Sequence, residues 1–249
     1  MSVKKGDFIL IDFVTKIKET GEFFDTTIAE EAKKGAIFKE STVYEPMFIV
    51  VGEGWVLKKL DNSLNNTSLD NEAIIEIPPE DGFGVRDPAK IKVIPINKFK
   101  KQDVRPYPGA QIEIDGKNAI VRSVGAGRVQ VDFNPPLAGK TLIYHLTIKK
   151  IIEDKLEKIK ALTHRRIPSV KIERFNFNIS DPEIMIELPE EAFALEGIQF
   201  SKRGLAADLQ NFFPIEKIIF TEVFTKPSPP LSEPQPKQGG DSADTQPLI

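Results

Sequence analysis

The most informative segment of this 249-residue chain is Gly21-Glu22-Phe23-Phe24-Asp25-Thr26-Thr27. It follows a run from Phe8 to Val14 in which β-branched and aromatic residues alternate across two faces, as in a buried strand. Lys18 to Gly21 carries turn residues, so the chain is predicted to reverse there. The polar stretch 26–45 behind it predicts a long loop with a short helical piece.

Two further apolar segments follow in order. Residues 46–51 predict a second strand, ended by Gly52-Glu53-Gly54, and the apolar residues of 55–64 recur near helical spacing, which predicts a short helix. Residues 72–77 predict a third strand, stopped by Pro78-Pro79. The segment behind these prolines is Glu80-Asp81-Gly82-Phe83-Gly84.

Residues 86–133 show a different pattern, with four short strands expected at 91–95, 110–114, 119–124 and 128–133. Asp115-Gly116 and Gly125-Ala126-Gly127 are typical of hairpin turns. This pattern predicts a small all-β unit. The chain then returns to one long alternating strand over 140–152.

The remaining sequence predicts a small α+β domain at 153–226. Helices are expected at 153–163 and 202–212, and strands at 170–179, 183–188 and 215–224. The tail 227–249 is rich in Pro, Ser, Gln and Gly and is predicted to be disordered.

Composition excludes several kinds of chemistry. Lys and Arg number 34 against 37 Asp and Glu, a net charge of −3, so no basic excess points to nucleic acid. The chain has no cysteine, which excludes disulfides and thiolate nucleophiles. His145 and His164 are not spaced as a ligand pair, so no metal or cofactor is predicted. No apolar run approaches the roughly 18 residues that span a bilayer, and the N-terminus lacks a signal peptide, which predicts a cytoplasmic protein without a membrane partner.

Taken in order, three stretches resemble the FKBP family of peptidyl-prolyl cis/trans isomerases. They are Gly21 to Thr27, Phe48-Ile49-Val50-Val51-Gly52 with Val56-Leu57 behind it, and Ile77 to Gly84; Leu142 to Ile148 is similar to the final core strand of the family. The resemblance covers residues 1–152. SlyD-like members carry a β domain inserted after the Tyr/Phe-Gly, which is where 86–133 falls, and 153–226 is similar to the C-terminal extension of long archaeal members.

The resemblance implies an α+β fold in which an antiparallel sheet wraps on a short helix. The implied domains are 1–85 with 134–152 for the isomerase, 86–133 for the insert and 153–226 for the C-terminal domain. The implied function is acceleration of proline-limited folding. Twisting an X-Pro amide must overcome a barrier of about 18–20 kcal/mol, and a dry apolar cage favours the less polar twisted state without an acid, a nucleophile or a metal.

The resemblance also implies the residues of the site. The catalytic positions are Phe24, Asp25, Phe83 and Tyr144, and the substrate-binding positions are Phe13, Met47, Val56, Leu57 and Leu60. Phe13 occupies its place only if the first hairpin is one residue longer than usual. Taken singly, these aromatic residues would be assigned to the core and Asp25 to a turn.

Four of these positions depart from the family pattern. Phe13 and Phe83 replace tyrosine, Met47 stands at an often aromatic place, and Leu60 replaces tryptophan. These departures favour an alternative function, a non-catalytic FKBP-like chaperone or binding module.

The partners follow from the apolar content of the two added domains. A unit of roughly 50 residues closes its core poorly, so the insert is predicted to expose apolar surface and to capture unfolded or nascent chains containing X-Pro by strand addition. The domain at 153–226 suggests either a homodimer or a second chaperone surface, and self-association is the favoured expectation.

Overall fold

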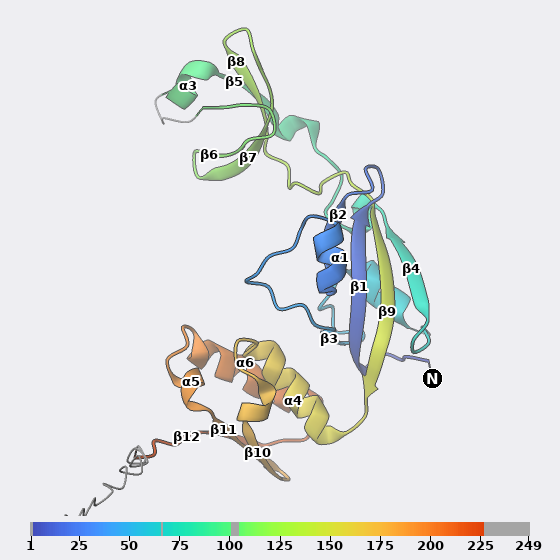
Figure 1. Ribbon diagram of the computed structural model, residues 1–249, viewed down its shortest axis with the longest axis vertical. Helices are drawn as coiled ribbons and strands as arrows, with labels where there is room; N and C mark the ends of the chain where they lie inside the picture. The colour runs from blue at the N-terminus through green and yellow to red at the C-terminus, as the bar shows by residue number, and fades with distance from the viewer. Residues whose placement is uncertain (1, 66, 101–104, 227–249) are drawn as a thin grey trace, which may run out of the picture. The chain divides into compact units, whose positions relative to one another are not determined.

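The computed structural model describes residues 2–65, 67–100 and 105–226. The chain divides after Arg165 into two compact units (Figure 1). The predicted disordered tail 227–249 lies outside the described residues. The described helices include none that is long and apolar enough to cross a membrane.

A five-stranded sheet is the framework of the first unit. Its order is β2-β1-β9-β4, and β3 also pairs with β1. The strands are β1 (Phe8–Ile17), β2 (Phe23–Thr26), β3 (Met47–Val50), β4 (Glu72–Ile77) and β9 (Leu142–Ile152). All of these pairings are antiparallel. The predicted α+β class with an antiparallel sheet is confirmed.

The core of this sheet lies on one face. Helix α2 (Lys58–Leu64) contributes Leu60 and Leu64 to the same buried cluster as the inward side chains of β1 and β9. The helix starts at Lys58, later than the sequence predicted, because the bend behind Gly52 and Gly54 continues through Val56 and the backbone of Leu57 is still non-helical, with ψ of 134°. Helix α1 (Ala29–Lys34) is the short helical piece expected in the polar segment. Strand β2 was not predicted.

The insert forms a second sheet with the order β5-β8-β7-β6. Its elements are β5 (Ile91–Pro95), α3 (Ile96–Lys100), β6 (Gln111–Ile114), β7 (Lys117–Gly125) and β8 (Arg128–Asp132). Both predicted hairpin turns are present, with positive φ at Asp115-Gly116 and at Ala126-Gly127. A separate buried cluster joins Phe99 of α3 to residues of this sheet such as Val121. Short 3-10 turns at Pro79–Asp81 and Pro88–Lys90 precede it.

The second unit is a three-stranded sheet with helices. Its strands are β10 (Asn176–Ser180), β11 (Glu183–Leu188) and β12 (Lys217–Glu222), and β12 runs parallel to β11. Such a parallel pair needs a crossover, which α5 (Glu190–Phe193) and α6 (Ile198–Phe212) supply. The predicted strand at 170–179 is wrong in its first half, where a 3-10 turn at Ile172–Arg174 precedes β10. Helix α4 (Lys155–Arg166) spans the division between the units.

Candidate active site

A β-bulge at Phe24 shapes the first part of the site. Thr15 on β1 lies opposite Asp25 on β2, whereas the next residue, Lys16, lies opposite Phe23, so Phe24 is the extra residue. A bulge of this kind turns the side chain out of the regular pleat.

The bulge brings Phe24 to Phe83. The two ring centroids are 6.2 Å apart and the rings meet edge to face. Both rings remain accessible, with 40% and 41% of their surface exposed. Phe83 follows β4 and the 3-10 turn behind it, so two segments far apart in sequence supply this aromatic pair.

Asp25, Thr15 and Tyr144 form one row across three strands. Thr15 lies opposite Asp25 on one side and opposite Tyr144 of β9 on the other, so the three side chains share a face of the sheet. Phe13, two residues earlier on β1, places its ring centroid 5.7 Å from that of Tyr144. The row therefore joins a carboxylate and a phenol to an apolar floor.

The remaining predicted residues belong to the floor or pack on it. Phe13, Leu60 and Tyr144 are members of the main buried cluster, and the partly buried residues packed against that cluster include Met47, Val56 and Leu57. Thus six of the nine predicted positions converge, and Asp25 joins them through the row. Phe24, the residue before Asp25, forms the exposed pair with Phe83.

The surroundings of Tyr144 and Asp25, the two titratable groups of the site, shift their pKa values. Burial raises the pKa of the Tyr144 phenol; the Thr15 hydroxyl lowers it, and the charge of Asp25 raises it further. Partial burial also raises the pKa of Asp25. The Thr26 N–H, which donates to the carboxylate at 2.9 Å, and the charge of Lys39 both act to lower this pKa, but burial has the larger effect. Asp25 still reaches water on its outer side, so its desolvation is incomplete.

Three family models match the chain. Residues 1–104 match the FKBP-type peptidyl-prolyl cis-trans isomerase, residues 92–137 the FKBP26 IF domain, and residues 155–225 the FKBP26 C-terminal domain. The short-type peptidyl-prolyl cis-trans isomerase of Methanocaldococcus jannaschii is 32% identical over 149 residues, which cover 60% of this chain and 94% of that protein. The chain belongs to the FKBP-type peptidyl-prolyl cis-trans isomerase family.

Two bacterial relatives are also similar to this FKBP-type isomerase. A probable FKBP-type 16 kDa isomerase of Pseudomonas fluorescens is 29% identical over 109 residues, which cover 41% of this chain and 71% of that protein. The SlyD isomerase of Helicobacter pylori is 24% identical over 123 residues, which cover 48% and 66%. The resemblance to SlyD-like and long members that the sequence indicated is confirmed.

The chemistry of an FKBP-type isomerase is rotation about a C–N bond. Rotation takes polarity away from the amide, so surroundings without water favour the twisted state over the planar one. The floor around Phe13 and Leu60, which are 4% and 2% exposed, offers such surroundings. No bond is broken, and no proton has to be transferred. Among the described residues, no group of three His, Cys, Asp or Glu side chains is placed to hold a metal ion.

Sequence reasoning missed Asp61, a residue that positions this site. Its carboxylate is buried and accepts hydrogen bonds from the backbone N–H groups of Gly52 and Gly54, at 2.8 and 2.9 Å. These bonds hold the turn that leads into Val56 and Leu57. Two features of the sequence could have revealed this role. Asp61 lies on the inner face of the predicted helix, and the N–H groups of the preceding Gly-x-Gly turn need acceptors.

Thr15 was missed as well. It occupies an inward position of β1 after Ile9, Ile11 and Phe13, where an apolar residue is the norm. Its hydroxyl is completely buried and makes no hydrogen bond of normal geometry with any described residue. A polar residue in an inward register was the signal that could have found it.

Proposed function

We propose that this isomerase accelerates proline-limited protein folding and that the insert, residues 86–133, holds unfolded segments while the site acts on their prolines. The division into 1–85 with 134–152, 86–133 and 153–226 is part of this proposal. Phe24, Asp25, Phe83 and Tyr144 would contact the twisting amide, and Phe13, Met47, Val56, Leu57 and Leu60 would form the cage around the proline ring.

The observation that carries the proposal is where the insert is attached. The chain leaves the main sheet at the end of β4 and passes through Phe83 before it enters the insert. The N–H of Gly139 donates to the carbonyl of Gly84 at 2.8 Å, so both ends of the insert meet beside the aromatic pair. A segment held by the insert is thereby tethered next to the site. Tethering raises the local concentration of its prolines without any new contact at the site.

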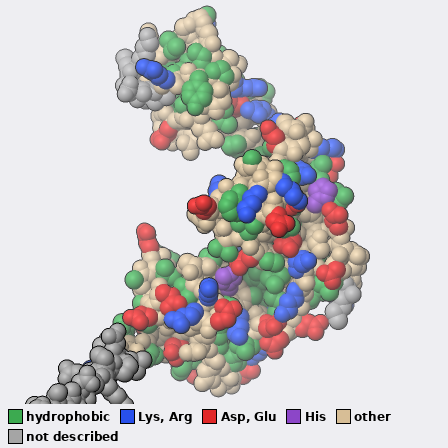
Figure 2. Space-filling model, viewed as in Figure 1, with side chains coloured by type: hydrophobic (Ala, Val, Ile, Leu, Met, Phe, Trp, Pro, Cys, Tyr) green, Lys and Arg blue, Asp and Glu red, His purple; other side chains and the backbone are tan. Residues whose placement is uncertain are grey.

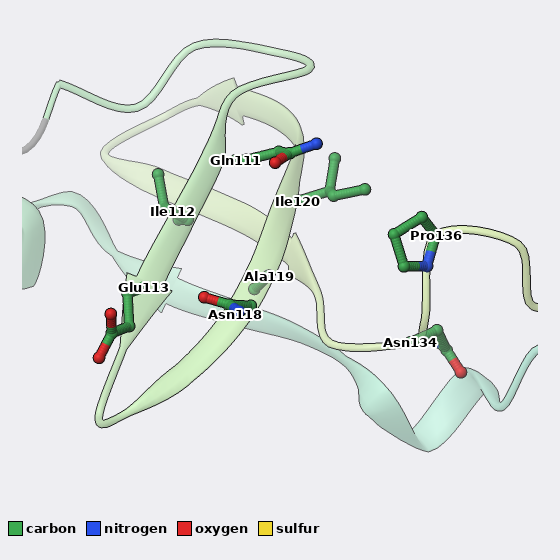
Figure 3. Close-up of a pocket in the computed structure, with 8 residues that line it drawn as sticks. All are labelled: Gln111, Ile112, Glu113, Asn118, Ala119, Ile120, Asn134 and Pro136. Atoms are coloured by element: carbon green, nitrogen blue, oxygen red, sulfur yellow. The ribbon is translucent and has the colours of Figure 1, made fainter. Parts of the chain in front are cut away.

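The surface of the insert supports a capturing role. Val93, Tyr107 and Val124 are 59%, 66% and 36% exposed. Strands β5 and β6 are the outer strands of the described sheet, and an outer strand can accept an extended peptide. A hollow of about 360 Å³ also lies between the β6–β7 hairpin and the returning segment with Asn134 and Pro136 (Figure 3).

Removal of the insert tests the proposal. Because Gly84 and Gly139 are already joined, residues 86–132 can be replaced by a short flexible linker. Isomerisation of a short X-Pro peptide should persist, whereas acceleration of the refolding of a whole protein should fall strongly. Equal losses on both substrates would refute the capturing role, and no acceleration of the peptide by the intact chain would favour the non-catalytic alternative.

We also propose that the C-terminal unit self-associates. Phe200 on α6 is 82% exposed and Phe224 is 78% exposed, with the Phe193 ring 5.0 Å from the Phe224 ring. Large exposed apolar groups of this kind favour an interface. Sedimentation should give a dimer at micromolar concentration and a monomer for Phe200→Asp; a monomeric intact chain would refute this. The cytoplasmic location stays a prediction.

A further inference from the structure

The insert differs in charge from the rest of the chain. Residues 86–133 contain ten Lys and Arg against five Asp and Glu, a formal charge of +5, whereas the whole chain carries −3. The remainder therefore carries −8. A basic segment within an acidic chain indicates that electrostatics select what binds there.

Part of this charge gathers around one groove of the insert. The groove has a volume of about 680 Å³ and is lined by β5, the start of α3, the β6–β7 turn and Phe133. Four of its lining residues are lysines and one is an aspartate: Lys90, Lys92, Lys98, Lys117 and Asp115. Figure 2 shows hydrophobic side chains gathered on the visible face of the insert with basic side chains beside them.

Most of these lysines lack a counter-charge. Lys98 binds Asp115 at 2.6 Å, while Lys90, Lys92 and Lys117 have no carboxylate partner among the described residues and are exposed. Lys92 lies with its ammonium 5.9 Å from the centre of the Phe133 ring. Among the described residues, the groove thus offers three ammonium groups without a carboxylate partner beside apolar surface.

The floor between the lysines is apolar. Val93, Ile94 and Pro95 of β5 line it together with Ile114 and Phe133. The other hollow of the insert has a different character, since it is lined by Gln111, Glu113 and Asn118 without any lysine (Figure 3). Of these two hollows, only this groove is lined by lysines.

We propose that this groove selects client segments in which acidic side chains flank apolar ones. The inference rests on the proposed capture of unfolded chains by the insert and adds a substrate class to it. Apolar client side chains fill the floor, acidic neighbours pair with Lys90, Lys92 and Lys117, and segments flanked by Lys or Arg are repelled.

The lining favours a peptide over a single-stranded nucleic acid. Nucleic-acid grooves combine basic residues with aromatic platforms on which bases stack. Here the floor is largely aliphatic, Phe133 is the one aromatic side chain among the residues that line the groove, and Lys92 lies over it.

Binding of two labelled peptides to the full chain tests the inference. The peptides have equal length and the same proline-free apolar core, flanked by Glu in one and by Lys in the other. The Glu-flanked peptide should bind roughly tenfold more tightly, as expected for two or three exposed ion pairs, and the preference should disappear at about 0.5 M salt.

Reversing the charge of two lysines tests whether this groove is responsible for the preference for the Glu-flanked peptide. Lys92→Glu with Lys117→Glu should abolish or invert it. The matched control is Arg122→Glu with Arg128→Glu, which changes the insert by the same charge at exposed positions that do not line the groove. This control should keep most of the preference.

Each outcome is decisive. Equal binding of both peptides, or equal effects of the two double variants, would overturn the charge selection and leave capture intact. Failure of the chain to bind either peptide would overturn the proposed capture itself. A single-stranded oligonucleotide that binds more tightly than the Glu-flanked peptide, and is displaced by it, would assign the groove to nucleic acid and overturn the inference.

Discussion

Thr15 lies directly opposite Tyr144 across β1 and β9, and its fully buried hydroxyl makes no hydrogen bond of normal geometry. It is nonetheless near enough to lower the pKa of the Tyr144 phenol. A buried polar group without a partner costs about 1–3 kcal/mol. The inward Thr15 hydroxyl therefore lowers the stability of the fold.

Thr15→Val should accordingly raise the free energy of unfolding by about 1 kcal/mol in urea titrations. Thr26→Val is the matched control, because the Thr26 hydroxyl is also buried but donates to the Phe13 carbonyl at 2.7 Å; it should destabilise by a similar amount. If the Thr15 hydroxyl serves the substrate or Tyr144, peptide isomerisation falls while stability rises. A destabilised Thr15→Val would contradict this account.

Phe24→Ala should reduce activity with little effect on folding. Its ring is 40% exposed and pairs with Phe83, so stability should change by less than about 1 kcal/mol. Loss of one aromatic contact with the substrate, worth about 0.5–1.5 kcal/mol, should lower kcat/KM for an X-Pro peptide roughly three- to tenfold. Phe200→Ala in the other unit is the control and should leave peptide isomerisation unchanged; an equal loss there would remove Phe24 from the site.

The regular strands could be predicted because their pattern is local. The alternation in β1, β4 and β9 is present in the sequence, and each was placed to within about two residues. Strand β2 was missed because the bulge at Phe24 breaks the period of two within only four residues. The five-residue helix α3 was missed for a similar reason, since Ile96 and Phe99 supply too little helical repeat.

The aromatic and apolar residues of the site could be predicted from the sequence, but the residues that position them could not. The order of the motifs supplied the candidate aromatic residues, and the structure brings most of them together. The roles of Thr15 and Asp61 depend on register and on contacts with Tyr144, Gly52 and Gly54, which no local pattern encodes. Roles that depend on contacts between distant parts of the chain could therefore be recognised only in the folded structure.

Substitution of Asp61 should weaken the site in graded steps. One carboxylate oxygen accepts from Gly52 and the other from Gly54; Asn keeps one acceptor and Ala keeps none. We expect the free energy of unfolding to fall by about 1 kcal/mol for Asp61→Asn and about 2–3 kcal/mol for Asp61→Ala. The KM for an X-Pro peptide should rise in the same order, because the turn positions Val56 and Leu57. Exposed Asp81→Ala is the control, and equal effects of Asn and Ala would refute the two-acceptor role.

Asp132 connects the two ends of the insert, because it binds both Arg86 and Asn134. Its carboxylate, 1% exposed, accepts hydrogen bonds from Arg86, from the Asn134 backbone at 2.9 Å and from the Asn134 side chain at 2.8 Å. Burial alone would raise the pKa of Asp132, but the bonds from Arg86 and Asn134 outweigh it and hold the pKa below its ordinary value. A lowered carboxyl pKa stabilises the fold above the ordinary value and ceases to do so as the pH falls through the lowered one.

Asp132→Ala should therefore destabilise the insert by about 2 kcal/mol at neutral pH, the scale of hydrogen bonds to a charged group. Hydrogen exchange of insert amides should quicken, while isomerisation of a short peptide persists, because the main sheet keeps its own core. Below about pH 3 the difference between the variant and the intact chain should shrink, since protonation removes the same charge. Asp115→Ala, which breaks an exposed pair with Lys98, should change stability by less than about 0.5 kcal/mol. A difference that persists unchanged in acid would show that the carboxylate charge is not what fastens the insert.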